Sequence, residues 1–462
     1  MRSIPRRSAV SATIGILFLL LGLLAPFAID PAIQRALGLT FFALIFWSAE
    51  PIPIELSSFL LLLLLPLCDL LSFEQSFAPF AGKTIWLIFA GMVISLSITE
   101  TALGDKLAQF SLRYLGRTPF RLLFNLHVLG LVVAILIPSG VVRVLLLMPL
   151  GIALADALSD KNNRYLSAAI LLSLICSTLY GGFGILTGGV PNLVVAGQFE
   201  QVTGREIYWG EWLIWMFPIL GLVRTALCFT VIWYLFGRKV DSFTSALPPS
   251  TDEKISLNNG QRRVLHILFL GMFLWATDTL HHIPPVYIGL GLVILYTLPL
   301  FGPLAFERIR QINYPFFFYI AALFSLAAAL NASGFNRHFV ELVTSIVDIN
   351  QYGPIGKHLA ITYMAVPLNF LMDVAAVAGV LTPALLDWGQ HYQLAEFPIA
   401  MSIAQATCQV FLPYQSAPFM VAFSYRRIGM LQLVQAMFLI SLLTLLLLSP
   451  LNILYWQALG LI

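Results

Sequence analysis

Apolar stretches long enough to cross a lipid bilayer follow one another along almost the whole chain. Residues 14–27, 59–67 and 436–448 contain no charged side chain. Apolar and polar residues do not alternate in these stretches, as they would in the strands of a membrane β-barrel, so helices are expected. Length and hydropathy predict membrane-spanning helices at residues 9–29, 37–52, 56–71, 84–101, 212–236, 264–280, 284–302, 315–332 and 429–450.

Four further apolar stretches are interrupted near their middle by glycine, proline or polar residues. A helix that breaks inside a bilayer leaves backbone N–H and C=O groups unpaired, which is costly unless those groups line a wet cavity or hold a ligand. A single break is often only a kink, but four breaks in one chain indicate a functional site. The interrupted stretches are residues 123–157, 165–197, 355–388 and 397–424.

The breaks recur in matching positions in the two halves of the chain. GGVPNLVVAG at residues 188–197 corresponds to QSAPFMVAFS at residues 415–424, since each has a proline followed by a Val-Ala step. Each is preceded by a stretch with a polar break and a downstream proline, at 139–149 in the first half and 373–383 in the second. Matching breaks in two halves of opposite orientation predict an inverted repeat.

These patterns predict an all-α polytopic membrane protein with about 11 transmembrane helices and two re-entrant hairpins in an inverted repeat. The predicted domains are an N-terminal helix (1–36), a first repeat (37–237, with hairpin 123–157 and broken helix 165–197), a cytoplasmic linker (238–263) and a second repeat (264–462, with hairpin 355–388 and broken helix 397–424).

Composition and charge agree with this class. The 462 residues are 59% hydrophobic and 10% charged, whereas a soluble chain carries about 25% charged residues. A membrane topology in which the arginines and lysines of the predicted loops face the cytoplasm agrees with all the predicted spans. This topology also places the N-terminus in the cytoplasm. The first apolar stretch lacks a small-residue cleavage site, so we expect a retained helix of an integral protein of the cell (inner) membrane.

The sequence shows no motif that indicates cofactor, metal or nucleotide chemistry. Its four cysteines are far apart within apolar segments, and no nucleotide- or metal-binding motif occurs. We therefore expect no organic cofactor and no nucleic-acid partner. A membrane-embedded enzyme or scaffold is a remote alternative, because it needs clustered titratable residues where this sequence has single charges. A channel suits four mirrored breaks less well than alternating access does.

Three parts of the chain carry a resemblance to a known family. The first part contains SAEPIP at 48–53, FAPFA at 77–81 and TIWLIFAG at 84–91. The second contains GGFG at 181–184 followed by GGVPN at 188–192. The third consists of the two hairpin tips. In order and spacing these parts resemble the divalent anion:sodium symporter family, which carries di- and tricarboxylates or sulfate. The resemblance implies a secondary transporter, not an enzyme, that works as an elevator-type homodimer.

The same resemblance implies which residues bind the substrate. The family has a Ser-Asn-Thr signature at each hairpin tip, ten residues before a proline, where side chains and backbone hold sodium and the substrate's carboxylate. Counting back from Pro149 and Pro383 places the tips at 139–141 and 373–375, so only the first serine of the two signatures is retained. The implied substrate-binding residues are Ser139, Gly140, Val141, Gly189, Pro191, Asn192, Asp373, Val374, Ala375, Ser416 and Pro418.

The coupling ion is open at this point. Sodium takes roughly six oxygen ligands, by the logic that governs other hard cations. The first tip offers Ser139 and carbonyls around Gly188 and Gly189, which is a degenerate sodium site, and the second tip offers Asp373 and little else. Sodium symport, proton symport through Asp373 and uncoupled exchange or uniport are the alternatives, and the loss of both asparagines favours the last two.

Arg143 lies one turn beyond Ser139, in a run that otherwise belongs in lipid. A cation there costs about 2.5–3.5 kcal/mol on insertion scales and is usually functional or paired. We expect Arg143 to bind an anion in a central cavity, helped by helix dipoles, or to stand in for sodium. The alternative is a permanent ion pair with Asp373. Arg224, also mid-span, is expected to pair with a neighbouring helix. The expected partners are thus a small anionic solute and the bilayer.

Overall fold

The computed structural model describes residues 6–24, 29–104, 106, 118–158, 164–240 and 256–462, and these residues form helices and loops without a strand. The first half, as far as the described residues go, contains α1 (Arg6–Leu24), α2 (Pro31–Ala49), α3 (Ile54–Leu67), α4 (Phe73–Phe77), α5 (Lys83–Glu100), α7 (Pro119–Leu136), α8 (Gly140–Leu158), α9 (Arg164–Tyr180), α10 (Val190–Thr203), α11 (Trp209–Met216) and α12 (Arg224–Leu235). The centre of the predicted linker, residues 241–255, lies outside the described residues.

The second half, within the described residues, is also helical. Its helices are α13 (Asn259–Ala276), α14 (Asp278–His281), α15 (Pro285–Thr297), α16 (Phe316–Ala332), α17 (Phe335–Ile346), α18 (Pro354–Ala365), α19 (Val374–His391), α20 (Glu396–Thr407), α21 (Ala417–Ser424), α22 (Met430–Leu443) and α23 (Ser449–Ala458). A π-helical turn joins α11 to α12 at Phe217–Val223, and another joins α22 to α23 at Thr444–Leu448. The last long helix of each half is therefore widened near its middle.

The chain is an all-α polytopic membrane protein, and in the described residues each span predicted from hydropathy overlaps a helix. In the described residues, seven helices are long and apolar enough to cross a membrane, or eight if the bent pair α16–α17 is one span. Both arms of the first hairpin, α7 and α8, are among the seven. Hydropathy measures only how apolar a segment is, so it does not separate a full span from a hairpin arm that turns back.

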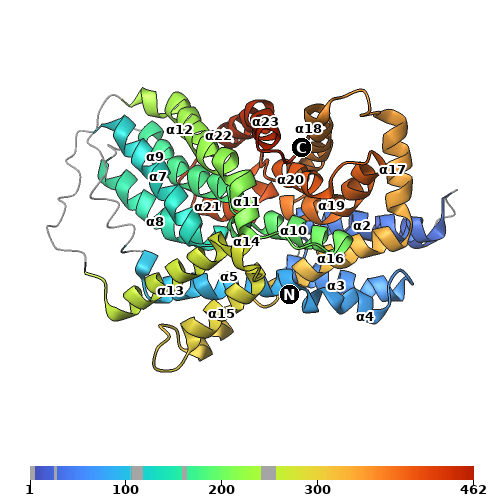
Figure 1. The fold of residues 1–462 in the computed structure, drawn as a ribbon, viewed down its shortest axis with the longest axis horizontal. Helices are drawn as coiled ribbons and strands as arrows, with labels where there is room; N and C mark the ends of the chain where they lie inside the picture. The colour runs from blue at the N-terminus through green and yellow to red at the C-terminus, as the bar shows by residue number, and fades with distance from the viewer. Residues whose placement is uncertain (1–5, 25–28, 105, 107–117, 159–163, 241–255) are drawn as a thin grey trace.

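The helices pack in two layers, which are seen edge-on in Figure 1. The lower layer contains α2, α3, α5, α13, α15 and α16, with α3 against α16 and α5 against α15. The upper layer contains the two hairpins, α7–α8 and α18–α19, together with α9–α12 and α20–α23. The aliphatic and aromatic faces between neighbouring helices are buried in both layers.

The broken helices link the two halves reciprocally within the upper layer. The first hairpin packs on α9 and the second on α20, so each hairpin lies beside the broken helix of its own half. Beyond the breaks the partners are exchanged, because α10 packs against α19 and α21 packs against α8. This exchange brings both hairpin tips and both helix breaks to one region of the molecule.

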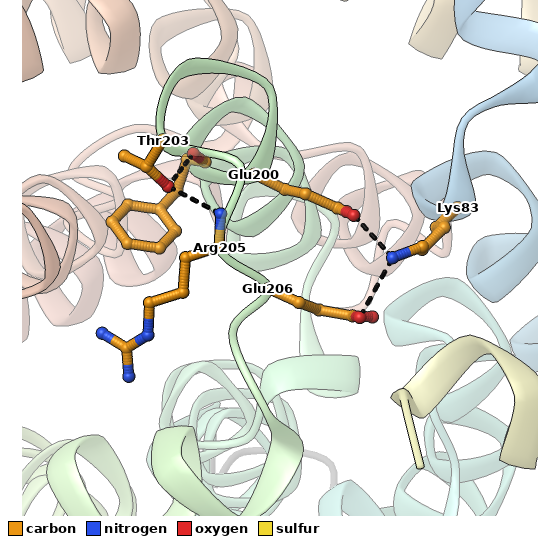
Figure 2. Close-up of polar contacts among 6 residues, drawn as sticks. Lys83, Glu200, Thr203, Arg205 and Glu206 are labelled. Atoms are coloured by element: carbon orange, nitrogen blue, oxygen red, sulfur yellow. Dashed lines mark hydrogen bonds and ion pairs between the residues drawn. The ribbon is translucent and has the colours of Figure 1, made fainter. Parts of the chain in front are cut away.

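A cluster of charged side chains joins the two layers away from that region. Lys83, at the start of α5, donates to Glu200 at 2.7 Å and to Glu206 at 3.1 Å, as Figure 2 shows. Glu200 lies in the last turn of α10 and Glu206 follows that helix, so the ammonium bridges the lower layer to the upper one. Burial raises the pKa of Glu206 above its ordinary value, although the ammonium of Lys83 acts in the opposite direction.

Candidate functional site

A cavity of about 1090 Å³ lies where the two layers meet. The lower layer contributes Trp47, Glu50, Trp275 and Tyr319 to its wall, and the upper layer contributes both hairpin tips and both helix breaks. Of the residues predicted to bind substrate or sodium, those that line it are Ser139, Gly140, Val141, Arg143, Gly188, Gly189, Pro191, Asp373, Val374, Ala375, Ser416 and Pro418. Tertiary packing therefore collects side chains from four distant segments in one place.

Four helices begin at this cavity. They are α8, α10, α19 and α21, whose first residues follow Ser139, Gly189, Asp373 and Ser416. The N-terminus of a helix presents unpaired N–H groups and the positive end of the helix dipole. At α10 and α21 no side chain caps these groups. The arrangement is therefore suited to a negatively charged ligand.

The local sequence explains the first break. The glycine-rich stretch 181–189 leaves the α-helix after Tyr180, and an added Cβ on Gly188 would lie 2.0 Å from the carbonyl oxygen of Gly182. Only glycine allows these two parts of the backbone to approach so closely. Pro191 then stands in the first turn of α10, where its missing N–H and fixed φ favour a helix start.

The second break has a different sequence but a similar construction. Helix α20 ends at Thr407, and α21 begins after Ser416 with Pro418 in its first turn. Between them, the side-chain oxygen of Gln415 accepts from the N–H groups of Phe411 at 2.6 Å and Leu412 at 2.9 Å. The amide nitrogen of Gln415 donates to the carbonyl of Asn369, which ties the break to the second hairpin.

Arg143 lies beside the first break with its guanidinium buried. Nη1 donates to the carbonyl of Thr178 at 2.6 Å, and Nη2 donates to the carbonyl of Gly188. Nε has no hydrogen-bond partner. Arg143 is 1% exposed and is one of the residues that line the cavity.

Asp373 caps the second hairpin and does not pair with Arg143. Its carboxylate accepts from the N–H of Ala375 at 2.8 Å and from the hydroxyl of Tyr319 at 3.2 Å. Tyr319 is on α16, so this contact also joins the upper layer to the lower one. Among the ion pairs of the described residues there is none between Arg143 and Asp373.

One predicted site residue is placed differently. Asn192 is buried outside the cavity lining, and its amide donates to the carbonyls of Phe183 at 3.0 Å and Ile185 at 2.8 Å. It therefore holds the shape of the first break. The Pro-Asn pair marks a helix start in the sequence, but the direction of the asparagine side chain depends on how the glycine-rich stretch folds back.

Arg224 is also buried beside a helix break, which the sequence did not reveal. Nη2 donates to the carbonyl of Cys408 at 2.9 Å and to the side-chain oxygen of Gln409 at 3.1 Å. The guanidinium carbon lies 4.6 Å from the centre of the Tyr180 ring. Tyr180 itself donates to the carbonyl of Val410 at 2.5 Å. The only sequence signal was a cation in the middle of an apolar span.

Comparisons with known proteins agree on one family. The family model for the sodium:sulfate symporter transmembrane region matches residues 6–462. A sodium-dependent dicarboxylate transporter, SdcS, of Staphylococcus saprophyticus is 24% identical over 444 residues, covering 88% of this chain and 83% of the relative. An uncharacterised transporter of Haemophilus influenzae is 23% identical over 460 residues, covering 96% and 95%.

The fold is also similar to that of a solved transporter. The crystal structure of the YdaH transporter of Alcanivorax borkumensis, described as having an unusual topology, matches with a TM-score of 0.57 and 16% sequence identity over 99% of both chains. At this identity the likeness concerns the fold alone.

Proposed function

This chain belongs to the sodium:sulfate symporter family, and from that premise we propose that it carries a small divalent anion, a di- or tricarboxylate or sulfate, by an elevator-type movement. It is a transport protein of the membrane and not an enzyme. The choice of anion, the elevator movement, a homodimer, the inner-membrane location and the cytoplasmic N-terminus are parts of the proposal.

The observation that carries the proposal is the meeting of four helix N-termini at one cavity. Each contributes the positive end of its dipole, and N–H groups near the middle of a membrane have no water to bind outside such a cavity. Discontinuous helices whose N-termini point at an anionic substrate are a recurring design in transporters with inverted repeats. The buried charge of Arg143, directly behind the first tip, adds to the same positive potential.

The charges of the cavity support a position of the anion near the first tip. Asp373 lies at the second tip, and Glu50 and Glu55 reach the cavity from the lower layer. A divalent anion avoids these carboxylates and is held by the starts of α8, α10 and α21. The position of the cavity between the two layers supports an elevator-type movement. If the upper layer slides along the lower one, it carries the cavity across the bilayer.

A thermal-shift screen tests the proposal. Purified protein is heated with succinate, malate, citrate, sulfate or phosphate, with and without sodium and at two pH values. A ligand that binds the folded state raises its melting temperature. At a hundredfold excess over Kd, it adds about 2.7 kcal/mol to the free energy of unfolding. We expect at least one divalent anion to give a shift and to enter proteoliposomes. If none gives a shift or crosses the membrane, the proposed function is wrong.

Arg143→Gln tests the role of the buried charge in the same assay. We expect this variant to fold and to lose the ligand-dependent shift, because the positive potential behind the first tip is removed. Wild-type uptake by the folded variant would contradict the assigned role.

A further inference from the structure

The orphan carbonyl groups of the first break are satisfied by this chain's own side chains. The last turn of α9 leaves carbonyls without an intrahelical partner, and Thr178 is one of these. Arg143 donates to it and to the carbonyl of Gly188 on the far side of the break. Asn192 takes two more carbonyls between them. The guanidinium thus bridges the two rims of the break as a bound cation would.

The second break is satisfied in the same way. Cys408 follows the last residue of α20, and its carbonyl, at the negative end of that helix, accepts from Arg224. Asn369 donates to the carbonyls of Ala406 at 2.9 Å and Gln409 at 3.0 Å. Each break therefore has one asparagine amide and one guanidinium that donate to its carbonyl groups.

Neither guanidinium has an acidic partner. Among the ion pairs of the described residues there is none that includes Arg143 or Arg224. Both side chains are nevertheless buried, at 1% and 0% exposure. Their charge is balanced by carbonyl oxygens at the C-terminal ends of α9 and α20, where the helix dipole is negative. In transporters built of broken helices, such carbonyls and helix ends coordinate the coupling cation.

The backbone around both arginines makes room for them. An added Cβ on Gly182 would lie 2.3 Å from Nη1 of Arg143, so the glycine opens the space that the guanidinium fills. Arg224 directly follows the π-helical turn at Phe217–Val223, which changes the helical phase at that point. π-helical turns of this kind occur frequently at functional sites.

We propose that Arg143 and Arg224 are two tethered cations that occupy the cation positions of the two breaks, so that this chain moves its anion without binding sodium at either one. The inference rests on the proposed anion transport and specifies its coupling. Sodium needs several oxygen ligands at once. The carbonyls of Thr178, Gly188 and Cys408 already accept hydrogen bonds from a guanidinium, so the donor set does not fit a sodium ion.

Sodium alone is the probe for this inference, because its binding can be read without knowing the anion. The melting temperature of the purified full chain is measured in NaCl and in choline chloride at equal ionic strength. We expect no sodium-specific shift in the wild type. Arg143→Ala and Arg224→Ala each free carbonyl oxygens, and we expect a sodium-specific rise on the order of 2 °C in each.

Arg35→Ala is the matched control. Arg35 also donates to a carbonyl at a helix end, that of Cys68 at 2.9 Å, but at the surface of the lower layer and away from both breaks. We expect this variant to show no sodium-specific shift. Arg224→Lys retains a cation, so it should fold as well as the wild type and stay insensitive to sodium, even if Arg224→Ala does not fold.

Each outcome decides the inference. A sodium-specific shift in the wild type overturns the inference. A folded Arg143→Ala variant that shows no sodium-specific shift also overturns it, and so does an Arg224→Lys variant that shows such a shift. A flux arm separates this inference from the proposed function. Succinate or sulfate entry into proteoliposomes that is equal in sodium and choline supports both proposals. If no anion enters, the transport proposal fails while the sodium measurement still stands.

Discussion

Gly182 and Arg143 show how closely the residues at the first break depend on one another. The guanidinium fills a space that exists only because residue 182 has no Cβ, and it donates to carbonyls on both sides of that space. A glycine in an apolar stretch is usually interpreted as a kink or a packing residue. Here it also makes room for a buried charge, so glycine and arginine act as one unit.

Gly182→Ala tests this dependence. We expect the added methyl group to displace the guanidinium and to lower the free energy of unfolding by about 1–3 kcal/mol, as overpacking of a filled core does. Gly291→Ala on α15 is the control, because an added Cβ there meets nothing within 4 Å. Thermal unfolding compares the two variants. Equal melting temperatures would show that the space at Gly182 adapts without cost.

Each broken helix behaves as two half-helices held together by side chains of the chain itself. Asn192 at the first break and Asn369 at the second each donate to two carbonyl groups, and one of each pair, that of Ile185 or Ala406, also accepts from a backbone N–H. The two asparagines come from different elements, since Asn192 is in α10 and Asn369 lies between α18 and α19. The breaks are thus stabilised in equivalent ways by sequences that differ.

Asn369→Ala should weaken the second break. The substitution leaves the carbonyl of Gln409 without its donor, and a buried unsatisfied group costs about 1–3 kcal/mol, while the carbonyl of Ala406 keeps the backbone N–H of Gln409 at 3.1 Å. Gln390→Ala removes a side-chain hydrogen bond to Glu396 at the surface and serves as the control, with an expected change within about 0.5 kcal/mol. Melting temperatures measured in detergent compare them, and an equal effect in both would contradict the assigned role.

At the scale of the whole molecule, polar contacts between described residues join the two layers around the cavity and at its side. Tyr319 contacts Asp373 beside the second tip, and Lys83 contacts Glu200 and Glu206 away from it. The elevator movement that we propose would break such contacts in every cycle. We therefore expect these contacts to affect the balance between the two positions of the upper layer more than they affect the free energy of unfolding.

Lys83→Met removes the charged bridge between the layers. We expect a change of less than about 1 kcal/mol in stability, because the pair is partly exposed, but a clear change in the rate of anion exchange in proteoliposomes. Arg205→Met is the matched control, since Arg205 pairs with Glu211 at 2.5 Å within the upper layer. An equal effect of both variants on exchange would contradict a role of the bridge in the movement between layers.

Hydropathy was sufficient to predict the helical membrane class, and the spacing of breaks predicted where helices would be interrupted. These features follow from local physics, because an apolar run of sufficient length forms a helix in lipid and glycine or proline interrupts it. The predicted hairpin at 123–157 is covered by α7 and α8, and the stretch at 397–424 by α20 and α21.

The directions of the polar side chains were decided by tertiary packing. Arg143 donates to the carbonyls of α9 and the break instead of pairing with Asp373, and Arg224 reaches a break 184 residues further along the chain. Asn192 points into its own glycine-rich stretch and away from the cavity. A buried donor turns to a carbonyl within reach, and for Arg224 that carbonyl comes within reach only when helices from both halves are packed together.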